Sequence, residues 1–280
     1  MSSGPSTVFK LNRAIDLYET IHEESARFIE REIDYDATPR RIGTNECDIL
    51  TWKKGVEDDP RIGVLVGEFV HDVRSGLDQL IYALVVANEY DPGEHTQYPI
   101  YDNEPGWVKD VVARDPCRKP SPVHGLNDIQ LDFIRERQPY CLTKKRRARH
   151  PLMKLLRMSN VDKHQTLHTS AVQAHAPSSV VYEPPGFIAI TKKTWESPTT
   201  IVEAHVKIGQ VQRRIIKRPP PDTKIKLRIR GIAEMVFSEE GKSPIASVND
   251  LGLIIECARE ILYGLWPGAS IRDLPSLSPD

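Results

Sequence analysis

Apolar residues recur at helical spacing in two long stretches of the chain. In residues 60–88, drawn at about 100° per residue, seven of them share one line within roughly 40°: Ile62, Val66, Phe69, Val73, Leu77, Leu80 and Leu84. Pro60 at the first turn and "NEYDPG" at the end mark the bounds of this helix. Residues 247–265 show a similar apolar face, and Ser247 and Asp250 are spaced for a capping box.

Three further helices follow from weaker patterns. In residues 9–33, apolar residues at helical spacing stand among many Glu and Arg, which predicts a surface amphipathic helix. "GLNDIQLDFIRERQPY" predicts a short helix capped by Asn127 and stopped by Pro139. The last of the three is expected to span roughly 151–173, because Leu152, Leu155, Leu156 and Leu167 define an apolar face.

The pattern changes to β-branched runs separated by Pro and Gly between Ser178 and Phe237. This pattern of β-branched runs separated by turn residues predicts an antiparallel meander of about five strands. "ATPRRIGTNECDILTWKKG" can hold one or two more strands. The order indicates an α+β fold with a β-meander inserted before the last helix. We expect a mainly helical segment 1–175, a sheet segment 176–240, and a C-terminal segment 241–280 whose helix packs back on the helical layer, followed by a tail.

The most apolar stretch, 62–87, is interrupted by five charged or histidine residues, which excludes a membrane span: Glu68, His71, Asp72, Arg74 and Asp78. The four cysteines are far apart and form no CxxC pair, so we expect reduced thiols in a cytoplasmic protein.

Charge is distributed unevenly although the net charge of the 280 residues is −1. Residues 1–143 carry 16 Lys and Arg against 26 Asp and Glu, whereas residues 144–230 carry 19 against 5, a net of +14. The basic segment either attracts a polyanion or is neutralised by acidic helices that fold against it.

Polar residues interrupt the apolar faces of two helices. Beside the core stripe of 60–88 run Gly67, His71, Arg74 and Asp78, and the last two are spaced for an ion pair. In the helix that begins near 151, Ser159 and Lys163 lie near the centre of the apolar face, with Asn160 and His164 at its edge.

A lysine at a core position needs an acidic partner or a water-filled cleft, and Asp78 and Glu68 are the candidates. The two helices therefore predict one polar site, in which His71, Arg74 and Asp78 face Asn160, Lys163 and His164. Such a cluster is either a structural network that fixes the core or a site with chemistry. A histidine can transfer a proton, and Arg or Lys can stabilise charge on a phosphoryl oxygen.

Those groups suffice for metal-independent RNA cleavage by attack of a 2′-hydroxyl on its own phosphate. Arg74 and Lys163 would oppose a divalent cation beside His71, Asp78 and His164, so we expect no metal and no cofactor. The basic run "KKRRARH" (144–150) is either a solvated loop or a phosphate contact.

Four segments, in order, carry a resemblance: "LVGEFVHDVRSGLDQLIYAL", "TQYPI", "GLNDIQLDFIRERQPY" and "HPLMKLLRMSNVDKHQTL". They resemble an uncharacterised bacterial family common in actinobacteria, over roughly residues 60–170. Its motifs are an Arg-Ser-x-Leu-Asp-His helix, Thr-Gln-Phe-Pro-Ile, Gln-Pro-Tyr and Ser-Asn-x-Asp-Lys-His-Arg. This chain departs from them at two positions, with Gln79 for the first His and Gln165 for the last Arg.

A more distant similarity is to HEPN domains, helical bundles that often dimerise and act as metal-independent ribonucleases or nucleotide binders. Their signature is Arg, four to six residues, then His; Arg157 and His164 match this spacing. The resemblance implies an HEPN-like helical part, a partner that is RNA or a nucleotide, and a homodimer. His164 would act as acid and base, Arg74 and Lys163 would stabilise phosphate charge, and the positioning residues would be His71, Asp78, Asn160, Asp162 and Arg157. The alternative is a non-catalytic interaction or scaffold protein in which the cluster is structural.

Overall fold

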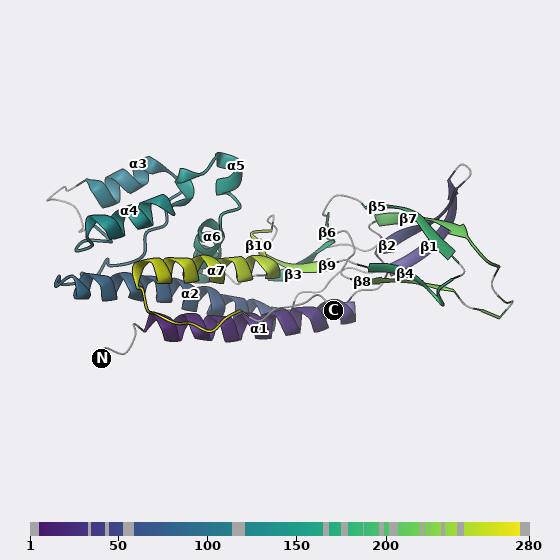
Figure 1. Cartoon of the computed structure of the whole chain (residues 1–280), viewed down its shortest axis with the longest axis horizontal. Helices are drawn as coiled ribbons and strands as arrows, with labels where there is room; N and C mark the ends of the chain where they lie inside the picture. The colour runs from purple at the N-terminus through teal and green to yellow at the C-terminus, as the bar shows by residue number, and fades with distance from the viewer. Residues whose placement is uncertain are drawn as a thin grey trace.

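The chain is a mixed α+β protein, as the sequence predicts, with its long helices toward one end and most strands toward the other (Figure 1). The computed structural model describes residues 6–32, 35–42, 45–52, 59–113, 121–164, 168–174, 179–186, 188–195, 199–201, 207–218, 220, 222–223, 225–230, 233–239 and 244–274.

Four long helices build the helical half: α1 (Thr7–Glu32), α2 (Pro60–Ala87), α6 (Pro151–His164) and α7 (Val248–Leu265). Asp59 caps α2 by accepting a hydrogen bond from the amide of Arg61. Ser247 and Asp250 form the predicted capping box of α7. These caps begin α2 and α7 within a residue of the predicted positions, because the local sequence signals coincide with the start of each apolar face.

Short helices connect α2 to α6: α3 (Glu104–Trp107), η1 (Val108–Val112), α4 (Asp128–Glu136), η2 (Pro139–Cys141) and α5 (Lys144–Arg147). The predicted cap Asn127 accepts a hydrogen bond from the amide of Gln130, and the side chain of Gln130 bonds back. Helix α4 ends before Pro139, as expected from the missing amide donor of proline.

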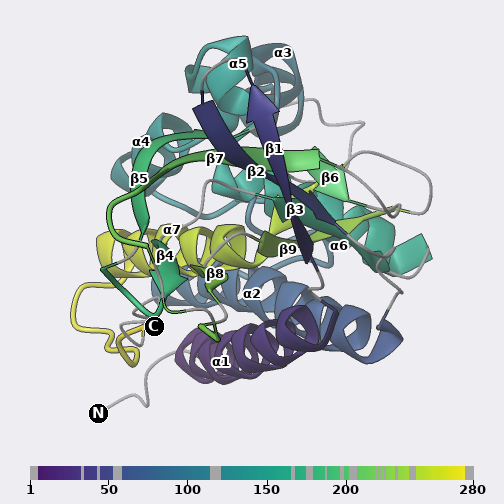
Figure 2. The same ribbon diagram turned by 90° about the vertical axis from the view of Figure 1, so that its right-hand side faces the viewer.

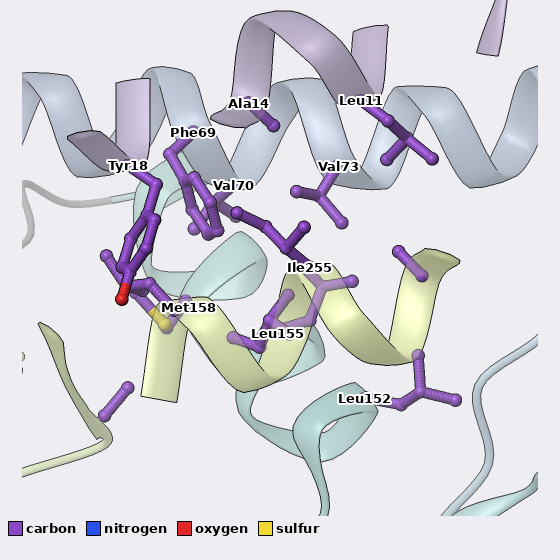
Figure 3. Packing of buried hydrophobic residues seen from close by; sticks show 14 of the residues in the cluster. Leu11, Ala14, Tyr18, Phe69, Val70, Val73, Leu152, Leu155, Met158 and Ile255 are labelled. Atoms are coloured by element: carbon purple, nitrogen blue, oxygen red, sulfur yellow. The ribbon is translucent and has the colours of Figure 1, made fainter. Parts of the chain in front are cut away.

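The hydrophobic core lies where α1, α2, α6 and α7 meet (Figure 3). Phe69 of α2 and Ile255 of α7 are completely buried between the helices. Burying one such side chain stabilises a fold by about 1.5–3 kcal/mol. Residues that Figure 3 labels in this cluster come from all four helices: Leu11, Ala14, Tyr18, Phe69, Val70, Val73, Leu152, Leu155, Met158 and Ile255.

The described strands form three antiparallel sheets with the orders β1-β2-β7-β5, β10-β9-β3-β6 and β4-β8. Their bounds are β1 (Tyr35–Ile42), β2 (Asn45–Trp52), β3 (His168–Ala174), β4 (Ser179–Glu183), β5 (Ile188–Trp195), β6 (Thr199–Ile201), β7 (Lys207–Ile215), β8 (Lys226–Arg230), β9 (Ala233–Ser238) and β10 (Ala246–Ser247). Figure 2 views the molecule from the strand end, with β1 and β2 crossing in front of the helices.

Two expectations about these segments are wrong. The helix expected over 151–173 ends at His164, and 168–174 is strand β3, which pairs with β9 and β6. The tertiary pairing of β3 outweighs the weak helical pattern there. The strands after Ser178 are antiparallel but form no simple meander, because β4 pairs with β8 and β5 with β7. Pairing of β2 with β7 also crosses the expected boundary at residue 175.

Helix α7 returns to pack against α1, α2 and α6. In the part of the chain that the structure describes, every helix is too short or too polar to cross a bilayer.

Candidate functional site

A cavity of about 660 Å³ lies between α2, α6 and the segment 96–101. Six of the predicted site residues line it: His71, Arg74, Asp78, Asn160, Asp162 and Lys163. The other lining residues include Ser75, Gln79 and Tyr82 of α2, Ser159 of α6, and Tyr98 and Tyr101 of the connecting segment. The two helices thus bring together residues that are about 80 to 90 positions apart in sequence, as the shared-site hypothesis expected.

The polar stripe of α2 forms one wall because its spacing keeps it on one helical face. At the first position of the stripe, Gly67 lies under α6, and a β-carbon there would collide with the carboxylate of Asp162. The absence of a side chain at Gly67 therefore lets the end of α6 approach α2 closely. Three positions of the stripe that follow, His71, Arg74 and Asp78, then reach the cavity.

Arg74 and Asp78 form the predicted ion pair, with 3.1 Å between Arg74 Nη2 and Asp78 Oδ1. Together they also hold the backbone of Tyr98. Asp78 Oδ1 accepts a hydrogen bond of 2.9 Å from the amide of Tyr98, and Arg74 Nη2 donates one of 2.8 Å to its carbonyl. The pair is thus a clamp on the segment that closes the cavity.

Gln138, which follows α4 in sequence, also holds this segment. Its Nε2 donates to the carbonyl of Pro99 at 2.9 Å, and its Oε1 accepts from the amide of Tyr101 at 2.9 Å. The Gln138 side chain is buried. Residues 98–101 are therefore fixed by side chains from two distant parts of the chain.

Burial raises the pKa of Asp78 above its ordinary value, against the opposing effects of Arg74, the Tyr98 amide and Lys163. A carboxyl group whose pKa is raised by folding contributes stability at low pH and loses it as the pH rises through its folded-state pKa. We expect the free energy of unfolding of the wild type, minus that of Asp78→Asn, to increase as the pH falls from 7 to 4.5. Urea denaturation across this range measures the difference.

The exposed Asp132 on α4 provides the control substitution, Asp132→Asn, which should change the free energy of unfolding by less than about 0.5 kcal/mol. If the difference in the free energy of unfolding between the wild type and Asp78→Asn stays constant or decreases toward pH 4.5, the pKa of Asp78 is not raised by folding.

Two polar atoms of the α2 wall of the cavity are buried without a hydrogen-bond partner, Arg74 Nη1, a donor, and Gln79 Oε1, an acceptor; the hydroxyl of Tyr98 in the connecting segment is also unpaired. Buried polar groups are nearly always paired, and an unpaired one costs about 1–3 kcal/mol. A ligand that offers an acceptor to Arg74 and a donor to Gln79 would remove both costs.

Lys163 does not occupy a core position, contrary to the expectation from the helical wheel. Ser159 is buried, but Lys163, Asn160 and Asp162 are exposed. The reason is that the cavity takes the place of core packing beyond Ser159, so the last turn of α6 lines open space. Glu68, one of the expected partners of Lys163, instead forms an ion pair of 3.0 Å with Arg13 of α1. Lys163 contributes to the electrostatic environment of Asp78 without a direct ion pair among the described residues.

The remaining predicted residues of α6 are placed less fully. His164 is the last residue of the helix, and its side chain lies outside the described part of the structure. Arg157 is exposed on α6 and does not line the cavity. The Arg157–His164 spacing therefore does not bring Arg157 to the cavity wall.

The basic run 144–150 is divided between structural and solvated groups. Arg147 donates to the carbonyls of Asp102, Tyr140 and Leu142 at 2.5–3.3 Å, so it fixes the connections around α5. Lys144, Lys145, Arg146 and Arg149 are exposed. Within this run, Arg147 is thus a structural residue, which the sequence pattern did not distinguish from its neighbours.

Sequence reasoning missed the roles of Gln138 and Tyr98. The only signal was their presence in the "QPY" and "TQYPI" motifs, which indicates importance but not contact. Asp72 was noted only as an interruption of an apolar run. It is 1% exposed and pairs with Lys10 at 2.7 Å and Arg13 at 3.2 Å, which joins α2 to α1.

Among the side chains that the structure describes, no three His, Cys, Asp or Glu residues gather closely enough to hold a metal ion. Comparison with known proteins adds no family to this geometry: no family model, curated protein or solved structure matches the chain.

Proposed function

We propose that the cavity between α2 and α6 binds a nucleotide or the end of an RNA strand. The observation that carries the proposal is the convergence of His71, Arg74 and Lys163 on one cavity in which Arg74 retains an unused donor. The volume is within the range of about 300–1,000 Å³ that is usual for small-molecule sites.

The balance of charge favours a ligand of mixed polarity over a bare anion. The formal charges of Arg74 and Lys163 are balanced by those of Asp78 and Asp162, which also line the cavity. Phosphate oxygens can accept from Arg74 and Lys163, while a base or ribose offers a donor to Gln79. Tyr82 is 53% exposed at the cavity and supplies an aromatic face for stacking.

Gln79→Leu separates binding from stability. Because Gln79 Oε1 is an unpaired buried acceptor, its removal should leave the free energy of unfolding unchanged or slightly higher. The affinity for a nucleoside monophosphate should fall by about fivefold to tenfold, and Lys163→Ala should cause a similar loss. Calorimetric titration with nucleoside monophosphates, nucleosides and inorganic phosphate measures the effect.

Lys144→Ala, at an exposed position of α5, is the matched control and should bind like the wild type. If the wild type binds none of these ligands, the nucleotide proposal is wrong. The interaction or scaffold role would then remain, and the clamp on Tyr98 would explain Arg74 and Asp78 as structural residues.

The catalytic form of the proposal is metal-independent RNA cleavage by a cytoplasmic, HEPN-like homodimer. In it His164 is the acid and base, Arg74 and Lys163 stabilise phosphate charge, and Asn160 and Asp162 position them. RNA incubated with the purified protein should be cleaved equally with and without EDTA, and His164→Ala should abolish cleavage. Nucleotide binding without cleavage would limit the function to binding.

A further inference from the structure

The four-stranded sheet β1-β2-β7-β5 has two chemically different faces. One face packs inward: Leu50 and Val211 are buried in the core cluster, and Asp48 accepts a hydrogen bond from the hydroxyl of Tyr182 on β4. Arg213 belongs to this inner face and lies 3.6 Å from Asp48 and 4.0 Å from Glu46. The inner face therefore neutralises its own cation.

The opposite face carries cations without acidic neighbours. The strand register places Arg40, Cys47, Gln212 and Lys192 in one row across β1, β2, β7 and β5, in which the small Cys47 is buried and the two end cations are exposed. Because side chains alternate along a strand, Arg214 lies on the same face, two residues beyond Gln212. Arg40, Lys192 and Arg214 are all exposed.

Among the described side chains on this face, none is acidic. The rest are Thr38, the half-buried Ile49, Gln210 and Thr194 in the next row on one side, and Ala189 opposite Arg214 on the other. No ion pair joins Arg40, Lys192 or Arg214 to any described residue. We name Arg40, Lys192 and Arg214 the sheet cations.

The sheet cations differ from other cations of the basic segment, such as Lys154, which pairs with Asp250 of α7 at 2.5 Å. The acidic N-terminal part supplies α1 and α2, which lie toward the other end of the molecule (Figure 1). Acidic residues of α1 pair locally, as Glu23 and Glu24 do with Arg27. The acidic helices therefore do not neutralise this face, and its charge is available to a partner.

We propose that this outer face binds the phosphate backbone of RNA, at a site separate from the cavity and independent of the nucleotide proposal. Neighbouring strands are about 4.8 Å apart, so the row from Arg40 to Lys192 spans about 14 Å. Cations at that separation can contact several phosphates, which follow each other at about 3.4 Å per strand along a duplex axis.

The chemistry of the face indicates backbone contacts and not base recognition. Gln210, Gln212, Thr38 and Thr194 can donate hydrogen bonds to phosphate and sugar oxygens. The described face has no aromatic side chain for stacking, so binding should depend little on sequence and strongly on salt. It also presents no exposed large apolar side chain of its own, which favours a nucleic acid over a lipid surface.

The test is fluorescence anisotropy of a labelled single-stranded RNA of about 20 nucleotides at several salt concentrations between 50 and 200 mM. The wild type should bind, and the variant R40Q/K192Q/R214Q should bind at least about tenfold more weakly at low salt. Loss of three phosphate contacts should reduce the slope of log K against log salt by about 2, since each contributes about 0.7 for a single strand.

The matched control removes three exposed cations elsewhere, K144Q/K145Q/R146Q on α5, and should retain both affinity and slope. Circular dichroism and urea denaturation establish that both triple variants fold, and the single variant Lys192→Gln keeps the test valid if the triple does not. Sheet-cation variants should bind nucleoside monophosphates like the wild type.

Three results would overturn the proposal: no RNA binding by the wild type, an equal loss in the α5 control, or stronger binding of the sheet cations to phosphatidylserine vesicles than to RNA. RNA binding that survives when nucleotide binding fails would refute the cavity proposal alone.

Discussion

Replacing Gln138 with leucine should lower the free energy of unfolding by roughly 3 kcal/mol. The side chain is 1% exposed, and its amide group pairs with the carbonyl of Pro99 and the amide of Tyr101. Leucine has a similar size but leaves both backbone groups without a hydrogen-bond partner. Each unpaired buried group lowers the free energy of unfolding by about 1–3 kcal/mol. Urea denaturation followed by circular dichroism measures the loss.

Gln97→Leu tests whether the loss is specific to the buried position. Gln97 is exposed and lies in the same segment, and its Oε1 accepts only a long hydrogen bond of 3.4 Å from Arg74 Nη2, so its replacement should change the free energy of unfolding by less than about 0.5 kcal/mol. Because Gln138 fixes one wall of the cavity, Gln138→Leu should also weaken nucleotide binding. Equal stability of the two variants would mean that Gln138 does not support the segment.

Asp72→Asn should cost about 2–3 kcal/mol of unfolding free energy. Asp72 is the buried member of a cluster in which Lys10 and Arg13 are 27% and 58% exposed. Removing one member of a buried ion pair costs about 3–5 kcal/mol, and the exposure of both cations to water reduces that figure here. The measurement is the change in urea midpoint at constant slope.

The exposed pair between Arg13 and Glu68 joins the same two helices and supplies the comparison. Glu68→Gln should cost less than about 1 kcal/mol, since ion pairs in water contribute little. Equal effects of Asp72→Asn and Glu68→Gln would show that burial adds nothing to the α1–α2 contact.

The features that could be predicted from the sequence are those that depend on residues within one helix. The caps of α2 and α7, the core stripe and the Arg74–Asp78 pair all follow from spacing within a helix. That two polar faces would meet was inferred because a lysine on an apolar face needs a counterpart. Lys163 is in fact exposed, so the two faces meet at a cavity and not around a buried lysine.

Contacts between segments that are far apart could not be predicted from spacing. Nothing in "TQYPI" indicates that the backbone of Tyr98 bonds to both Arg74 and Asp78, or that Gln138 bonds to Pro99. The end of α6 illustrates the same limit. The sequence "HTSAVQA" is compatible with a helix, but in the folded protein it pairs with β9 and β6 as a strand.

The restraint on residues 98–101 has a consequence for the kinetics of association. Both polar groups of the Tyr98 backbone, with the carbonyl of Pro99 and the amide of Tyr101, are already bonded within the protein. Residues 98–101 are therefore already ordered before a ligand enters the cavity. Binding should cost little conformational entropy in this segment. Its bimolecular rate constant should be governed by diffusion and orientation, without a slow conformational step.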